Sequence, residues 1–135
     1  MPGSTNQTSS NDPSLMNNTC NKDITAGNVT LRALDLHGDT TPSYSINSTN
    51  FTVDIETGGV CTGGSCIECD GSRLSNNSYA TITGSTMPSG NNSLNYGNAT
   101  SGQEQLYYCL TDVNSGLMAQ QYSTNTLGSW TLQVL

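Results

Sequence analysis

Hydrophobic and polar residues alternate in several short segments of the chain, and no segment has the 3.6-residue period of an amphipathic helix. The clearest alternation spans residues 51–56, with the sequence FTVDIE. A period of two is typical of a strand with one face in the core and the other in solvent. The pattern therefore predicts a strand in which the apolar residues face the core, and Asp54 and Glu56 face solvent.

Further strands are expected at residues 28–37, 44–46, 79–83, 105–113, 117–123 and 130–135. Turn residues such as Gly and Asn separate these segments. About seven short strands joined by turns predict an all-β protein with the architecture of an antiparallel β-sandwich.

Two of the predicted strands, at residues 28–37 and 130–135, have distinctive apolar patterns. In residues 28–37 the apolar residues change face midway, and a β-bulge near Ala33–Leu34 would account for the change. In residues 130–135, Trp130, Leu132 and Val134 alternate with polar residues. We expect these three side chains to face the core.

The first 18 residues are polar and lack periodicity. We expect residues 1–18 to be either a flexible linker or an extended arm that docks on a neighbouring subunit and completes its sheet, with Leu15 and Met16 as apolar anchors. Residues 19–135 would then form a single β-sandwich domain. The chain has no run of 18 apolar residues, so we expect no membrane insertion within it.

The polarity of the chain comes from uncharged residues. Asn, Ser and Thr make up 53 of the 135 residues, whereas only 10% are charged and the net charge is −7. The basic residues are Lys22, Arg32 and Arg73. Three cations cannot form the basic patch that nucleic acid or an anionic membrane requires, so the composition argues against both partners.

Eight Asn-X-Ser/Thr sequons are spread along the chain. They begin at Asn6, Asn17, Asn28, Asn47, Asn50, Asn76, Asn91 and Asn98. The abundance of Ser and Thr alone would produce roughly four such matches, so composition explains part of the set. The remaining excess predicts an exported protein whose N-glycans hydrate its surface.

The five cysteines are Cys20, Cys61, Cys66, Cys69 and Cys109, and three of them lie within nine residues. A haem attachment motif would need His after Cys69, where Asp70 stands instead. A zinc site would use Cys61, Cys66 and Cys69 with either Cys20 or Cys109, but a second paired Cys motif is missing.

Disulfides are the favoured interpretation of these cysteines for an exported domain with a modest core. Five cysteines allow two bridges and one unpaired thiol. The simplest scheme joins the cysteine-rich loop to the sandwich through Cys109. It then either closes a small loop within residues 61–69 or attaches Cys20.

The segment Tyr107-Tyr108-Cys109, followed by the final strand at residues 130–135, resembles the last two strands of an immunoglobulin variable domain. The resemblance implies an immunoglobulin-like sandwich, with Tyr107 as the tyrosine of the family's tyrosine corner. It also implies that Cys20 is the disulfide partner of Cys109. The sequence departs from the family because no Trp follows Cys20 at the required distance.

About 110 residues of the chain also resemble the extracellular β-sandwich domains of archaeal surface proteins and pilins. The resemblance lies in the Asn/Ser/Thr-rich, sequon-dense and lysine-poor composition, and in the strand-turn-strand pattern of residues 110–122 followed by Trp130-Thr131-Leu132. It implies a structural role in a cell-surface assembly. Pilins of this kind carry an N-terminal hydrophobic helix that the chain lacks, so the resemblance implies either removal of that helix or assembly by strand exchange.

The remaining candidate residues predict little chemistry. His37 is the only histidine and precedes a Gly-Asp turn, so it is expected to be a turn or surface residue. Asp39 and the pair Asp70-Gly71 are possible calcium ligands in an extracellular loop. A carbohydrate-binding surface would use exposed aromatic residues, for which the candidates are Tyr44, Tyr79, Tyr96 and Trp130.

The sequence therefore favours a glycosylated, disulfide-bonded structural subunit or module of an extracellular filament, pilus or surface layer. We expect no enzymatic activity, no cofactor and no resident metal. The expected partners are identical subunits or other surface proteins. The alternative function is that of a secreted carbohydrate- or calcium-dependent adhesin or binding module.

Overall fold

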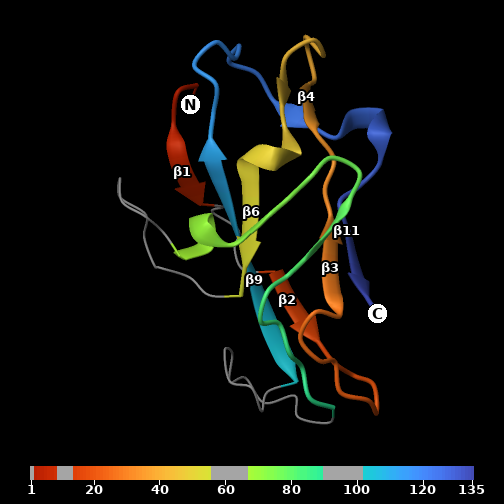
Figure 1. Cartoon of the computed structure of the whole chain (residues 1–135). Helices are drawn as coiled ribbons and strands as arrows, with labels where there is room; N and C mark the ends of the chain where they lie inside the picture. The colour runs from red at the N-terminus through yellow and green to blue at the C-terminus, as the bar shows by residue number, and fades with distance from the viewer. Residues whose placement is uncertain (1, 9–13, 56–66, 90–101) are drawn as a thin grey trace.

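The computed structural model describes residues 2–8, 14–55, 67–89 and 102–135 (Figure 1). Within these ranges the chain forms eleven β-strands and three 3₁₀ helices, and it contains no α-helix. The strands are β1 (Thr5–Thr8), β2 (Ser14–Asn17), β3 (Val29–Arg32), β4 (Leu36–Gly38), β5 (Ser45–Ile46), β6 (Phe51–Asp54), β7 (Ser72–Arg73), β8 (Tyr79–Thr81), β9 (Gln103–Asp112), β10 (Tyr122–Ser123) and β11 (Thr131–Val134). The 3₁₀ helices are η1 (Ser48–Asn50), η2 (Ile67–Asp70) and η3 (Asn125–Leu127).

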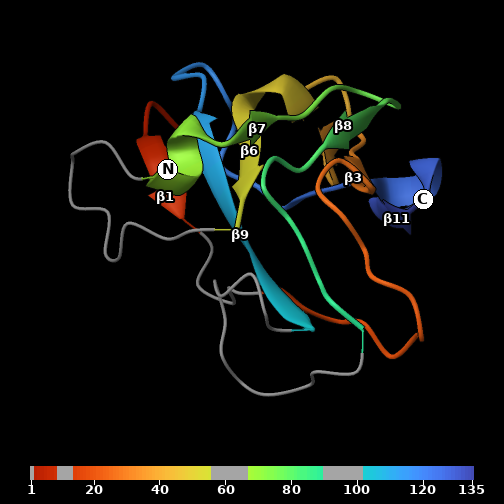
Figure 2. The same ribbon diagram turned by 60° about the horizontal axis from the view of Figure 1, so that its bottom comes forward.

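The strands form three antiparallel sheets. The largest has the order β1-β9-β6-β7, with β2 also paired to β9, and the two smaller sheets have the orders β11-β3-β8 and β10-β4-β5. Figure 2 shows the β9 sheet on one side and the β3 sheet on the other, and β7 of the first sheet contacts β8 of the second. The predicted all-β, antiparallel class is confirmed, although the strands are shorter and more numerous than the seven expected.

The ten-residue strand β9 is the centre of the largest sheet. Both β1 and β6 pair with Leu110, so these two strands lie on opposite edges of β9. Val113 donates its amide hydrogen to the Ser4 carbonyl, whereas the Gly102 carbonyl accepts from Asn18. β2 pairs with residues 103–106 of β9, whereas β1 and β6 pair with residues between 107 and 112.

The N-terminal segment differs from the expectation of a flexible linker or an arm on a neighbouring subunit. Its strands β1 and β2 pair with β9 of their own chain, and Met16 is buried in the core. Asn18 holds the end of β2 in place: its side-chain amide donates to the carbonyls of Lys22 (2.8 Å) and Met87 (2.7 Å), and its Oδ1 accepts from the Cys20 amide (3.0 Å). A buried, fully paired asparagine of this kind fixes a unique backbone path.

The predicted strand at residues 28–37 is divided into β3 and β4, which belong to different sheets. This replaces the single bulged strand that the apolar pattern suggested. Residues 33–35 lie between the two strands, and the Asp35 carboxylate accepts hydrogen bonds from the Ser48 amide (2.7 Å) and hydroxyl (2.9 Å). These bonds draw the chain toward η1 and away from the β3 sheet.

Trp130 packs between the sheets, as its place in the alternation predicted. Its ring packs edge-to-face against Phe51, with 5.2 Å between the ring centroids, and the centroid of Tyr108 lies 6.4 Å away. Its indole N–H donates to the Leu34 carbonyl (2.9 Å). The rest of the core consists of buried aliphatic and sulfur-containing side chains from both large layers. Its members are Met16, Val29, Leu31, Ala33, Val53, Leu74, Ile82, Met87 and Leu106.

The prediction that Leu132 and Val134 also face a closed core is wrong. Leu132 is 40% exposed and Val134 is 46% exposed. Both lie on β11, which is the last strand of its sheet, so nothing in the described part of the chain covers their outer side. Alternation identifies the face of a strand but does not show whether a second layer extends far enough to cover it.

A disulfide joins Cys69 in η2 to Cys109 in the middle of β9. Cys109 is fully buried. The Thr52 hydroxyl donates to the Glu68 carbonyl (2.6 Å), so η2 is also held against β6. The bond thus connects the cysteine-rich loop to the central strand, as the simplest pairing scheme proposed.

Replacing both cysteines of this bridge, Cys69→Ala with Cys109→Ala, should lower the free energy of unfolding by about 4 kcal/mol, the chain-entropy value for a sequence separation of 40 residues. Urea unfolding followed by the fluorescence of Trp130, the only tryptophan, measures the change. Cys20→Ala is the control, since that thiol is free and exposed, and it should change stability by less than about 0.5 kcal/mol. Equal stabilities of the double variant and the wild type would contradict the structural role of the bridge.

Candidate functional site

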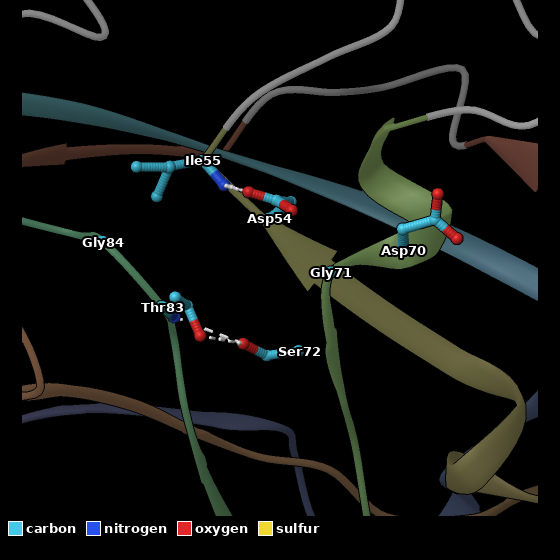
Figure 3. Close-up of a pocket in the computed structure, with 7 residues that line it drawn as sticks. All are labelled: Asp54, Ile55, Asp70, Gly71, Ser72, Thr83 and Gly84. Atoms are coloured by element: carbon cyan, nitrogen blue, oxygen red, sulfur yellow. Dashed lines mark hydrogen bonds between the residues drawn. The ribbon is translucent and has the colours of Figure 1, made fainter.

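A polar pocket of about 400 Å³ lies where β6, η2 and β7 meet the turn after β8 (Figure 3). The turn contributes Thr83 and Gly84, and the other lining residues belong to β6, η2 and β7 or lie directly beside them. The lining residues are Asp54, Ile55, Asp70, Gly71, Ser72, Thr83 and Gly84. The pocket therefore depends on the packing of η2 against β6.

Gly71 permits that packing. A Cβ atom at this position would lie 2.5 Å from the Val53 carbonyl oxygen, which is backbone and cannot move aside. On the opposite wall, the Thr83 amide donates to the Ser72 hydroxyl (3.2 Å), and the two hydroxyls are also 3.2 Å apart (Figure 3). Glycine at residue 71 and this hydroxyl pair together set the width of the pocket.

The chemistry of the pocket is that of oxygen donors. The structure brings the predicted calcium candidate Asp70 to the same pocket as Asp54, whereas the other candidate, Asp39, lies elsewhere and accepts a hydrogen bond from Ser123 (2.5 Å). Asp54 uses one carboxylate oxygen to accept from the Ile55 amide (2.7 Å). Among the described residues, no group of three or more His, Cys, Asp or Glu side chains is placed to hold a metal ion.

A second pocket, of about 340 Å³, is mainly apolar and was not foreseen from the sequence. It lies between the C-terminal end of β9 and the segment that leads to β10. Its lining residues are Pro2, Ile46, Leu110, Val113, Leu117, Met118, Ala119, Gln120 and Tyr122. The apolar residues are spread over four segments of the chain, so no local pattern marks them as one surface.

Gln120 holds the wall of this apolar pocket in place. Its Oε1 accepts from the amides of Thr40 (3.1 Å) and Thr41 (2.8 Å). A Cβ atom at Gly38 would lie 2.3 Å from Gln120 Nε2, so glycine at residue 38 provides the space for this side chain. The bonds connect residues 117–122 to the turn after β4.

The sequon asparagines within the described residues all lie at the surface. Asn17, Asn47 and Asn76 are exposed, and Asn6, Asn28 and Asn50 are partly exposed. Asn91 and Asn98 lie outside the described residues. No sequon begins after Asn98, so the part of the chain that forms β9, β10 and β11 contains none.

The cysteine candidates have three outcomes. Cys69 and Cys109 are bonded to each other, Cys20 is a free and exposed thiol, and Cys61 and Cys66 lie outside the described residues. The partner that the immunoglobulin resemblance implied for Cys109 is therefore wrong. In addition, β11 pairs with β3 and not with β9.

The aromatic and histidine candidates are dispersed. Trp130 lies in the core, Tyr79 is exposed beneath the Arg32 guanidinium at 5.9 Å, and Tyr44 is half-buried. Tyr96 lies outside the described residues. His37 belongs to β4, with its Nδ1 3.2 Å from the Pro42 carbonyl, close to the turn position that the sequence predicted.

Comparison with known proteins gives no family: no protein-family model, curated protein or solved structure matches this chain. None of the helices in the described ranges has the length and hydropathy needed to cross a membrane.

Two carboxyl groups have displaced pKa values. A hydrogen bond from the Ser89 amide (2.8 Å) lowers the pKa of the exposed Asp23. Burial raises the pKa of Glu104, although hydrogen bonds from the amides of Gln105 and Thr86 oppose the shift. Burial in β9 therefore disfavours the charged form of Glu104 in the folded protein.

The buried Glu104 makes stability depend on pH in a defined direction. The folded state binds the Glu104 proton more tightly than the unfolded state does. The stability that this proton contributes is therefore fully present below the ordinary glutamate pKa of 4.5, and it is lost as the pH rises through the raised pKa of the folded state. Glu104→Gln should therefore raise the free energy of unfolding at pH 7 and change it much less at pH 4. Urea titrations at the two values measure the difference. A stability gain of equal size at both would contradict this assignment, and Asp112→Asn, at an exposed position of the same strand, is the control.

Proposed function

We propose that the chain is a non-enzymatic structural subunit or module of an extracellular filament, pilus or surface layer, and that N-glycans coat it. The observation that carries the proposal is the position of the sequons. All six within the described residues lie at exposed or partly exposed positions, where a glycan fits without unfolding the sandwich.

The low charge of the chain supports the same proposal. Only 10% of the residues are charged, and a surface rich in Asn, Ser and Thr is neutral. Glycans would supply the hydration that charged side chains give to most proteins. The Cys69–Cys109 bridge fits an oxidising compartment outside the cytosol.

In such an assembly, the partners are copies of the same chain or other surface proteins. Exposed apolar residues support a role in protein contacts, because contiguous patches of this kind usually mark interaction sites. Such side chains include Met118 at the apolar pocket and Leu132 and Val134, which lie on the same face of β11.

The proposal predicts a glycosylated protein within an ordered array. Protein isolated from the surface of the source cells should exceed its sequence mass until it is deglycosylated, and electron microscopy should show it in a filament or lattice. Asn47→Gln should remove the mass of one glycan. Asn114→Gln is the matched control, because Asn114 is exposed and lies outside any sequon. A mass without sugar, together with free thiols at Cys69 and Cys109, would contradict the proposal.

The alternative function is a calcium- or carbohydrate-dependent binding module. The observation that favours it is the meeting of Asp54 and Asp70 with the Ser72 and Thr83 hydroxyls at one pocket. If this alternative holds, calcium will raise the melting temperature of the wild type but not of Asp70→Asn, with Asp39→Asn as the control. Identical melting curves with calcium and with a chelator would reject the calcium form of this alternative.

A further inference from the structure

We propose that the outer edge of β11 is a self-association surface, on which β11 of a second copy pairs in antiparallel fashion to continue the β11-β3-β8 sheet. The inference rests on the proposed structural function and identifies the surface through which subunits would meet. Three properties of β11 carry it: the direction of its backbone groups, the exposure of its apolar side chains, and the absence of charged residues and sequons within the strand itself.

The backbone of β11 has one edge available for pairing. Leu135 donates its amide hydrogen to the Asn28 carbonyl (2.8 Å), so the odd-numbered residues of this segment direct their backbone groups toward β3. The N–H and C=O groups of Leu132 and Val134 consequently point to the opposite edge. No described strand pairs with that edge.

The apolar side chains of β11 extend the core face of the sheet. Leu132 and Val134 lie in register with Leu31 and Val29, both of which are buried. Directly opposed residues in a sheet share a face, so these two exposed side chains belong to the face that packs in the core. A strand added beyond β11 would cover them and would place its own alternate side chains on the same face.

The edge lacks the protection that natural sheet edges usually carry. Residues 129–135, SWTLQVL, contain no charged residue, no Pro and no Gly. Three other border strands differ from β11. Asn6 and Asn17 place sequons on β1 and β2, and Thr83, which follows β8, donates a hydrogen bond to Ser72 of β7.

The charge of the chain favours a second copy as the occupant. Two molecules of net charge −7 repel each other, and they approach most easily through a surface without charge. After Glu104 the only charged residue is Asp112, and the cation nearest to β11 along the sheet is Arg32 of β3. An acidic or basic partner would find no complementary charge on β11, whereas an identical strand needs none.

The β11 sequence is also complementary to itself. In an antiparallel pair related by a two-fold axis through Gln133, Leu132 of one copy lies opposite Val134 of the other. Both apolar pairs then fall on the core face, and the Gln133 side chains of both copies fall on the outer face. The outward backbone groups of Leu132 and Val134 face each other in this arrangement, so their hydrogen bonds are satisfied between copies.

The contact of one four-residue edge is smaller than the roughly 1,200–2,000 Å² that stable interfaces bury. We therefore expect a weak dimer in solution, which becomes effective when other contacts hold many subunits in an array. The test must cover high protein concentrations.

Sedimentation equilibrium of the full chain over a wide concentration range tests the inference. The wild type should form a dimer, and Val134→Lys should weaken it by at least about tenfold because the lysine ammonium cannot enter the apolar face. Leu127→Lys places the same charge on an exposed leucine of η3 and should leave dimerisation unchanged. Val134→Pro should also weaken the dimer, because it removes an outward N–H without breaking a bond to β3.

Thermal unfolding of each variant establishes that the monomer folds, since residue 134 is half exposed in the monomer. A monomeric wild type at all concentrations, or equal weakening by Val134→Lys and Leu127→Lys, would overturn the inference. Electron microscopy separates this failure from that of the proposed function. If the β11 variants still assemble like the wild type, the β11 contact is rejected and the structural function stands; if natural cell-surface protein forms no array, the structural function itself is rejected.

Discussion

The structure depends on β9, because this one strand joins elements from nearly the whole length of the chain. It pairs with β1, β2 and β6, and Cys109 at its centre is bonded to Cys69. Each of these partners is distant in sequence, so the ordering of β9 brings together segments that have little local tendency to fold. A chain with a small core gains the most stability from such a strand, because the backbone of one central strand provides hydrogen-bond partners for several other strands.

The pockets follow from what is attached to β9. The disulfide places η2 beside β6, and Gly71 lets the chain pass close to the Val53 carbonyl, so Asp54 and Asp70 come to one pocket. The end of β9 supplies Leu110 and Val113 to the apolar pocket, which Gln120 closes. Both pockets are therefore consequences of the central strand and of the side chains that attach loops to it.

The sequence predicted the elements whose pattern is local and regular. β6 and β9 have apolar residues at strand spacing, and Trp130 was expected in the core, where it lies. β1 could not be predicted, because its residues TNQT are polar and become a strand only through backbone pairing with β9. The division of β3 from β4 depends on the bonds between Asp35 and Ser48, which no periodicity shows.

The sequons are unevenly distributed along the chain. Every sequon lies in the first 98 residues, and the C-terminal strands have neither sequons nor charges apart from Asp112 and the start of β9. For β9 this is expected, because its position between other strands leaves no space for a glycan. β11 has the composition of such an inner strand but stands at a border, with Leu132 and Val134 exposed. An uncharged, apolar strand at the edge of a sheet is best explained if another strand pairs with it and completes the sheet. Because β11 has no charged residue, β11 of a second copy can pair with it without charge repulsion at the contact, although the whole chain is acidic.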